Sequence, residues 1–142
     1  MWVAERAKMM EKRMRKLDGL RRAAPPPVVE GRPDADVTFV AWGSTVGAIR
    51  DAMPILEAQG ISTNLLFVRT VYPLRADIVS TTLESARTSL LVEANYSGQL
   101  GQLIRQETGI LLPHRLLKYD GEPFYPHEIV AKVREMTGHG GQ

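Results

Sequence analysis

Two short polar segments of the sequence each follow an apolar run, and their residue types could bind a ligand. Gly43, Ser44 and Thr45 come directly after the run 37–42, and an amphipathic pattern begins at the next residue. A glycine turn before a helix leaves backbone N–H groups and the positive end of the helix dipole free to bind an anion. We also expect the hydroxyl groups of Ser44 and Thr45 to cap this helix.

The turn matches the known phosphate-binding loops only in part. A Walker loop has a lysine before its Ser or Thr, and the segment 43–47 contains no lysine. The dinucleotide-binding fingerprint has its second glycine two residues after the first, where this sequence has Thr45. We therefore favour a structural turn, in which Gly47 allows close packing of the helix on the sheet, over a phosphate site.

The second polar segment follows the apolar run 89–92. Glu93 and Asn95 stand at its carboxyl end, and in an open α/β sheet such strand ends line the functional crevice. Glu93 could act as a base or accept a hydrogen bond from a ligand. It could equally be a solvated strand end or a partner of Arg69, and we favour a structural or interface role. The candidate residues outside the first turn are Arg69, Glu93, Asn95, Tyr96, Ser97, Gly98 and Gln99.

Other chemistries find little support in the sequence. It contains no cysteine, which excludes disulfides, thiolate nucleophiles and cysteine-ligated iron–sulfur clusters on this chain. His114, His127 and His139 have no partners at metal-ligand spacing, so we expect no metal site. No serine-centred nucleophile elbow and no pair of catalytic carboxylates emerges, so we assign no catalytic residue.

The elements that position these segments follow from the hydrophobic pattern. Apolar runs predict buried strands at 37–42, 61–68, 89–93 and 111–119, and a short edge strand at 28–30. Helical periodicity predicts helices at 46–59, 75–86, 99–107 and 126–136. Pro54 should kink or break the first of these helices near residues 50–53. Strands that alternate with helices favour a mainly parallel sheet covered on both faces.

The first 22 residues form a basic segment. They hold eight Lys or Arg residues and three Asp or Glu residues, and residues 4–22 are predicted to form an amphipathic helix. Such a helix should dock either on its own domain or on a partner chain, and both alternatives stay open at this point. Its apolar stripe consists of Val3, Ala7, Met10, Met14 and Leu17, and Lys8, Lys12, Arg15 and Lys16 lie opposite.

The expected organisation is one globular domain preceded by this helix. We assign residues 1–22 to the basic amphipathic helix, 23–36 to a Pro-rich connector with the edge strand, 37–138 to the α/β domain and 139–142 to a mobile tail. No apolar run approaches the ~20 residues of a membrane span, and the basic amphipathic start is unlike a secretory signal. We therefore expect a cytoplasmic protein that binds neither membranes nor nucleic acid.

Several segments of the sequence resemble alpha subunits of 2-oxoacid:ferredoxin oxidoreductases of the 2-oxoglutarate or pyruvate type. They are residues 41–50, 69–73, 92–100 and 117–124, while residues 6–13 resemble the connecting helix before that domain. The resemblance implies a three-layer α/β/α, transketolase C-terminal-like fold with a sheet of about five strands, mostly parallel, and a short antiparallel edge strand. It also places the strand at 37 centrally, so that the loops after Trp42 and Glu93 meet at the topological switch point.

The resemblance further implies a function in a complex. These complexes convert a 2-oxoacid and CoA to acyl-CoA and CO2 and reduce ferredoxin, using thiamine diphosphate, Mg2+ and iron–sulfur clusters. The family's thiamine-contacting pyrimidine domain lies upstream of this region, so we expect a separately encoded piece or a truncated copy with no cofactor of its own. Tyr125 stands where the family usually has a Thr that caps the last helix, which is a local loss.

The expected role is therefore a non-catalytic accessory or assembly domain. Its implied partners are the pyrimidine domain and the beta subunit, with ferredoxin and CoA reached through the complex, and a homodimer is a second form of association. The alternatives are a free-standing small-anion or nucleotide-binding module that uses the Gly43–Thr45 turn, and a non-functional remnant.

Overall fold

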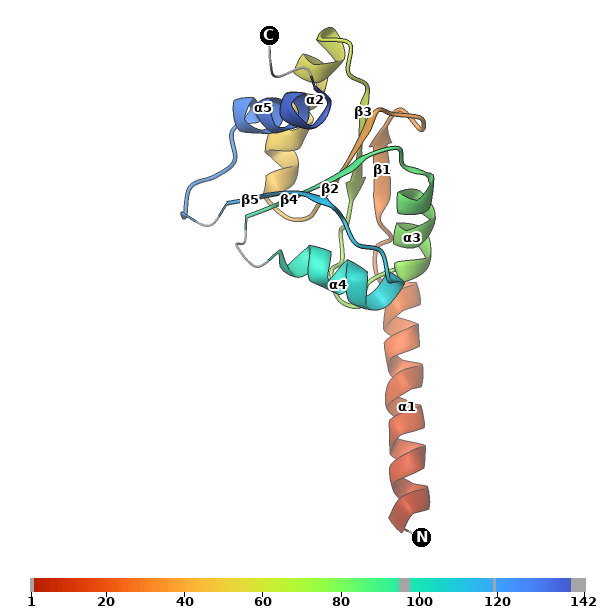
Figure 1. Ribbon diagram of the computed structural model, residues 1–142. Coiled ribbons are helices and arrows are strands. Elements are labelled where there is room, and N and C mark those ends of the chain that lie inside the picture. The colour runs from red at the N-terminus through yellow and green to blue at the C-terminus, as the bar shows by residue number, and fades with distance from the viewer. Residues whose placement is uncertain (1, 95–97, 119, 139–142) are drawn as a thin grey trace.

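The central strand of the protein, β2 (Val37–Ala41), is buried at every residue. This burial follows from its apolar sequence, because a strand without a wet face must be covered by helices on both sides. The computed structural model describes residues 2–94, 98–118 and 120–138, and it shows a five-stranded sheet between two helical layers (Figure 1). The predicted three-layer α/β/α architecture is confirmed.

The sheet has the strand order β1-β3-β2-β4-β5. Parallel pairs join β2 to β3, β2 to β4 and β4 to β5, while β1 runs antiparallel to β3 at one edge. The predicted central position of β2 and the antiparallel edge strand are therefore confirmed. The other strands are β1 (Val28–Gly31), β3 (Thr63–Phe67), β4 (Ser89–Glu93) and β5 (His114–Leu117).

Two hydrophobic cores flank the sheet. Alternate side chains of β2 point to opposite faces: Phe39 joins α2 (Thr45–Ala58) and α5 (Pro126–Met136) in one core. Val40 joins α3 (Ala76–Ser85) and α4 (Gln99–Thr108) in the other core. The sheet therefore holds its loops between two packed layers, and its carboxyl edge is set by rigid elements.

The predicted break at Pro54 and the predicted bounds of the last strand are wrong. Helix α2 continues without a break through Pro54, because Ile49, Ala52 and Leu56 on either side of the proline are fully buried and their packing outweighs one missing backbone bond. The last strand covers only His114–Leu117, since Pro113 cannot donate to a sheet ladder. The other helices begin and end within a residue or two of the prediction.

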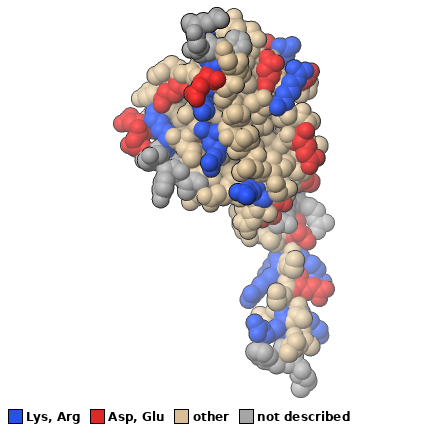
Figure 2. Space-filling model, viewed as in Figure 1, with Lys and Arg blue, Asp and Glu red and all other residues tan. Residues whose placement is uncertain are grey.

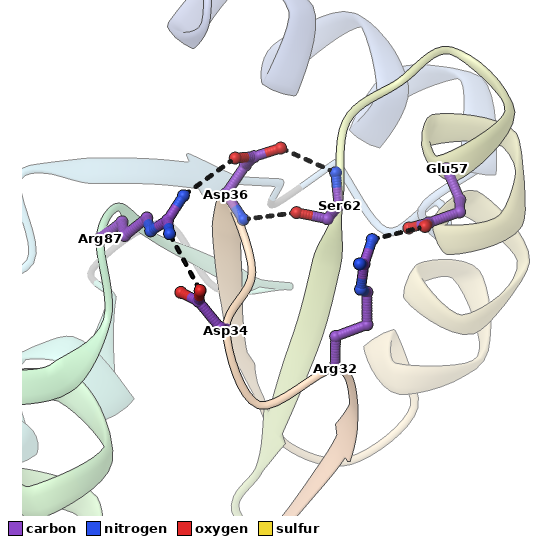
Figure 3. Close-up of polar contacts among 6 residues, drawn as sticks. All are labelled: Arg32, Asp34, Asp36, Glu57, Ser62 and Arg87. Carbon is purple, nitrogen blue, oxygen red and sulfur yellow. Dashed lines mark hydrogen bonds and ion pairs between the residues drawn. The ribbon is translucent and has the colours of Figure 1, made fainter.

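Polar contacts fasten the amino edge of the sheet (Figure 3). The backbone N–H of Asp36 donates to Ser62 Oγ at 2.8 Å, and the N–H of Ser62 donates to Asp36 Oδ2 at 2.9 Å. The pKa of Asp36 lies below its usual range, first because its carboxylate accepts the backbone N–H of Ser62 and then because of the Ser62 side chain, and the reciprocal pair of hydrogen bonds aligns the starts of β2 and β3. Arg87 pairs with Asp34 at 2.9 Å and with Asp36 at 3.6 Å, which ties the chain after α3 to the same corner.

Helix α1 (Trp2–Ala23) projects away from the body of the protein (Figure 1). It has no extended packing contact with another element in the described part of the chain, and Lys and Arg side chains lie along it (Figure 2). Of the two predicted alternatives, docking on its own domain is therefore not what the structure shows. Among residues 2–94, 98–118 and 120–138, no helix has both the length and the apolar character to cross a membrane.

Candidate functional site

The ends of β2 and β4 border an open pocket of about 310 Å³ at the carboxyl edge of the sheet. Parallel strands that lie next to each other bring their following loops together at this edge. Five of the predicted candidate residues are therefore placed in one site. The lining residues are Trp42, Gly43, Ser44, Thr45, Glu93, Ala94 and Gln99.

Glu93 is the most buried polar residue of this site, with 1% of its surface exposed. Its Oε1 accepts hydrogen bonds from Trp42 Nε1 at 3.1 Å and from the backbone N–H of Leu100 at 2.9 Å. Its Oε2 lies 3.1 Å from the same Leu100 nitrogen. Since Leu100 is in the first turn of α4, the carboxylate satisfies an otherwise unpaired helix N–H group and meets the positive end of the helix.

The Glu93 contacts join the two loops that were predicted to meet. Trp42 directly follows β2 and Leu100 lies in the first turn of α4, so the Glu93 side chain is hydrogen-bonded to both segments. Of the alternatives left open for Glu93, pairing with Arg69 is not what the structure shows, because Arg69 Nε donates to the carbonyl oxygen of Pro26 at 3.0 Å. A solvated strand end is excluded as well, since this carboxylate is buried.

The Gly43 turn differs from the predicted helix cap. Ser44 occupies the N-cap position with φ −72° and ψ −15°, and its side chain makes no capping hydrogen bond, because a capping hydroxyl requires an extended N-cap backbone. Thr45 Oγ donates instead to the carbonyl oxygen of Trp42 at 3.0 Å. Gly43 has φ +65°, a conformation that favours glycine.

The role predicted for Gly47 is also wrong. A Cβ atom at Gly47 would meet nothing within 4 Å, whereas a Cβ at Gly101 in α4 would lie 2.7 Å from Leu91 Cδ2. The close approach of a helix to the sheet therefore occurs at α4 and β4, and not at the start of α2.

The remaining predicted residues have different positions. Gly98 is buried and has φ +63° just before α4, and Arg69 is exposed after β3 and does not line the pocket. Asn95, Tyr96 and Ser97 lie outside the described residues.

Lys118 is a structural residue beside this site that sequence reasoning named only within a longer motif. Its Nζ lies 2.8 Å from Glu128 Oε1 and 2.8 Å from the carbonyl oxygen of Pro123. It also lies over the rings of Phe124 and Tyr125, at 5.8 Å and 5.1 Å. The hydrogen bond to Glu128 raises the pKa of Lys118 and lowers that of Glu128. The lysine therefore holds the loop after β5 against α5, and its backbone N–H donates to Glu93 O at 3.2 Å.

Tyr125 stands at the N-cap position of α5, and Glu128 is the third residue after it. The carboxylate of Glu128 accepts the backbone N–H of Tyr125 at 2.9 Å, which is one half of a capping box. A signal for this contact is present in the sequence, because a Glu three residues after an N-cap is typical of such a box.

The residues of the pocket are better suited to binding a partner than to transferring a proton. Both oxygens of Glu93 already accept hydrogen bonds, and the remaining lining offers an indole, two hydroxyl residues and an amide. A phosphate group in the pocket would face the Glu93 carboxylate, so these residues do not fit the diphosphate of a thiamine cofactor. Within the described ranges, no group of three or more His, Cys, Asp or Glu side chains could hold a metal ion.

Comparison with known proteins agrees with this architecture. Residues 28–108 match the family model described as the transketolase C-terminal domain. The chain is 34% identical over 138 residues to a 2-oxoacid:ferredoxin oxidoreductase subunit alpha from Saccharolobus solfataricus, which covers 95% of this chain and 22% of that protein. A subunit alpha from Aeropyrum pernix is 32% identical over 135 residues. The chain therefore spans about a fifth of the length of these curated relatives.

Solved structures show the same similarity. The 2-oxoglutarate:ferredoxin oxidoreductase from Magnetococcus marinus, solved with 2-oxoglutarate, coenzyme A and succinyl-CoA bound, superposes with a TM-score of 0.84 and 31% identity, over 93% of this chain and 23% of that chain. The alpha chain of a probable 2-oxoacid ferredoxin oxidoreductase from Thermoplasma acidophilum has a TM-score of 0.58 and 37% identity, over 81% of this chain and 99% of that chain. A split-gene transketolase, at 20% identity and a TM-score of 0.59, shares the fold.

Proposed function

Because this chain belongs to the transketolase C-terminal domain family, in the branch that forms part of 2-oxoacid:ferredoxin oxidoreductase alpha subunits, we propose that it acts as an accessory assembly domain of such an oxidoreductase. The complex would convert a 2-oxoacid and CoA to acyl-CoA and CO2 and reduce ferredoxin. The reacting groups would lie on other domains or subunits, and this chain would hold them together.

Helix α1 is the observation that carries the proposal. Val3, Met10 and Met14 of the apolar stripe expose 72%, 61% and 66% of their surface. Apolar side chains that share one helix face and stay exposed indicate a docking surface. Its Lys and Arg residues favour a partner whose apolar groove is bordered by acidic side chains.

The carboxyl edge of the sheet is the second proposed contact. Trp42 exposes 38% of its surface beside the pocket, and partly exposed aromatic residues are enriched at protein interfaces. Glu93 holds Trp42 in one orientation, so the indole is preorganised for a partner. The proposed partners are the pyrimidine domain and the beta subunit, with ferredoxin and CoA bound by the complex. A homodimer is a further form of association to be tested.

Substitution of the apolar stripe tests the docking surface. We expect the double variant Met10→Gln and Met14→Gln to bind the thiamine-binding subunits more weakly. Burial of a Met side chain contributes about 1.5–3 kcal/mol, and roughly two thirds of each side chain is available, so the pair should contribute about 2–4 kcal/mol. That loss corresponds to about 30- to 1,000-fold in Kd. Glutamine forms helices about as well as methionine, and circular dichroism checks that the helix remains.

Met9 supplies a matched control. It exposes 57% of its surface but lies off the stripe, so Met9→Gln should leave the affinity unchanged. Equal losses in Met9→Gln and in the double variant would contradict docking through the stripe.

An anion-binding module is the second candidate function. The N-terminus of α2 opens on the pocket, and no acidic residue occupies its first turn, which favours an anion. The buried carboxylate of Glu93 in the same lining opposes one. Phosphate titration followed by nuclear magnetic resonance separates the two functions, because the assembly role predicts no phosphate-dependent shift at residues 43–45, whereas a saturable shift there would favour the module.

A further inference from the structure

A second polar pocket, of about 240 Å³, lies at the amino edge of the sheet, opposite the site described above. It is enclosed by β1, by the starts of β2 and β3 and by the end of α3. Thr38 and Asn64 form its inner wall. They are direct partners in the parallel register of β2 and β3, and they are only 2% and 4% exposed.

Asn64 is incompletely hydrogen-bonded. Its Nδ2 donates to the carbonyl oxygen of Arg32 at 2.6 Å, whereas its Oδ1 is buried and has no hydrogen-bond partner among the described residues. Exchange of the amide atoms does not remove the problem, because the Arg32 carbonyl can only accept. A buried polar atom without a partner is destabilising. A hydrogen-bond donor from outside the chain that reached Asn64 Oδ1 would remove this cost.

The opposite wall also offers acceptors. The hydroxyls of Thr81, Thr82 and Ser85 donate to carbonyl oxygens of their own helix, at 2.9, 2.9 and 3.0 Å. Their oxygen lone pairs therefore remain available to a ligand. At the rim, Asp34 is paired with Arg87 at 2.9 Å (Figure 3), so the lining carries little net charge.

We propose that this pocket binds a small neutral molecule that donates hydrogen bonds, such as a primary carboxamide on a short aliphatic frame. The donor group would reach Asn64 Oδ1 between β2 and α3, and the aliphatic part would contact the apolar lining of Val29, Pro33 and Ala35. An ammonium group fits less well, because its desolvation would not be offset by a free carboxylate. The proposal is independent of the assembly role.

A series of small probes tests the proposal on the full chain. Propionamide should shift the backbone resonances of residues 34–38, 63–65 and 81–86 with a Kd of about millimolar, as expected for so few atoms. N,N-dimethylpropionamide, which has no N–H donor, and propionate, which is an anion, should bind at least about tenfold more weakly.

Two variants connect binding to the proposed group. Asn64→Leu keeps a similar shape and removes the acceptor, so it should weaken propionamide binding about tenfold or more. Ser80→Ala, on the same helix but outside the lining, should bind as the unchanged chain does. Resonances that do not move in propionamide, equal binding of all three probes, or full binding by a folded Asn64→Leu chain would each overturn the proposal. So would a crystal at saturating propionamide with only water at Oδ1.

Discussion

Replacement of Glu93 by glutamine should lower the free energy of unfolding by about 2 kcal/mol. The carboxylate is 1% exposed and accepts from Leu100 N–H and Trp42 Nε1. A hydrogen bond to a charged group contributes about 1.5–3 kcal/mol, and a negative charge at a helix N-terminus contributes about 0.3–1 kcal/mol. A glutamine oxygen at the Oε1 position can accept from both donors but carries no charge, and the amide N–H₂ at the Oε2 position faces the Leu100 N–H, which also donates, so roughly half of this total is lost.

The cost of burying the Glu93 charge acts in the opposite direction on the free energy of unfolding. Burial of a carboxylate without a cation costs several kcal/mol, and a neutral glutamine would remove that cost. The N–H groups of α4 and Trp42 replace the lost water around Glu93, so we expect the hydrogen bonds to dominate. An unchanged or higher free energy of unfolding in Glu93→Gln would refute this reasoning.

Urea unfolding of Glu93→Gln and of an exposed control, Glu84→Gln, provides the assay, and the control should change by less than about 0.5 kcal/mol. A double-mutant cycle with Trp42→Phe isolates the indole contact, with an expected coupling energy of about 1 kcal/mol. The sequence holds two tryptophans, so Trp2→Phe leaves Trp42 as the single indole reporter. Its emission should shift to longer wavelength when the Glu93 carboxylate is replaced.

Four further results are expected. Gly101→Ala should lower the free energy of unfolding by about 1–2 kcal/mol, because the new Cβ would lie 2.7 Å from the buried Leu91 side chain. Gly47→Ala should raise the free energy of unfolding by about 0.5–1 kcal/mol, since a Cβ there meets no other atom and Ala favours a helix. The same urea assay measures both variants. A change in the same direction for both would contradict the difference in packing between Gly47 and Gly101. The lowered pKa of Glu128 and the raised pKa of Lys118 predict that their pair stabilises the fold at neutral pH. This contribution should disappear as the pH falls through the folded pKa of Glu128, so the stability of Glu128→Gln should approach that of the unchanged chain at acid pH, and a difference that stays constant with pH would count against the pair. Titration calorimetry of the isolated chain with thiamine diphosphate should give no binding, and a micromolar Kd would contradict that expectation.

The strands of the sheet could be predicted because their sequences fit few other structures. An apolar run such as 37–42 fits only a strand buried on both faces, and such strands alternate with amphipathic helices along the chain. The resemblance then supplied the strand order, which periodicity alone does not give. The break allowed at Pro54 does not occur, because burial of Ile49, Ala52 and Leu56 outweighs the loss of one backbone hydrogen bond.

The site could be located but not described from the sequence. The loops after Trp42 and Glu93 were predicted to meet, because they follow adjacent strands. The partners of Glu93 depend on how the Trp42 indole and the first turn of α4 are oriented in space, and no spacing rule encodes that. The opposite behaviour of Gly47 and Gly101 likewise follows from which helix approaches the sheet.

The association of the chain in its native cell tests the central claim most directly. The chain should be purified at native abundance through a small tag at its carboxyl end, with the bound polypeptides identified by mass spectrometry and thiamine diphosphate measured in the same fractions. The account predicts that the thiamine-binding and iron–sulfur subunits of one oxidoreductase co-purify in fixed ratio and are lost with Met10→Gln and Met14→Gln. A chain that elutes alone, with no thiamine diphosphate in its fractions, would contradict the assembly role.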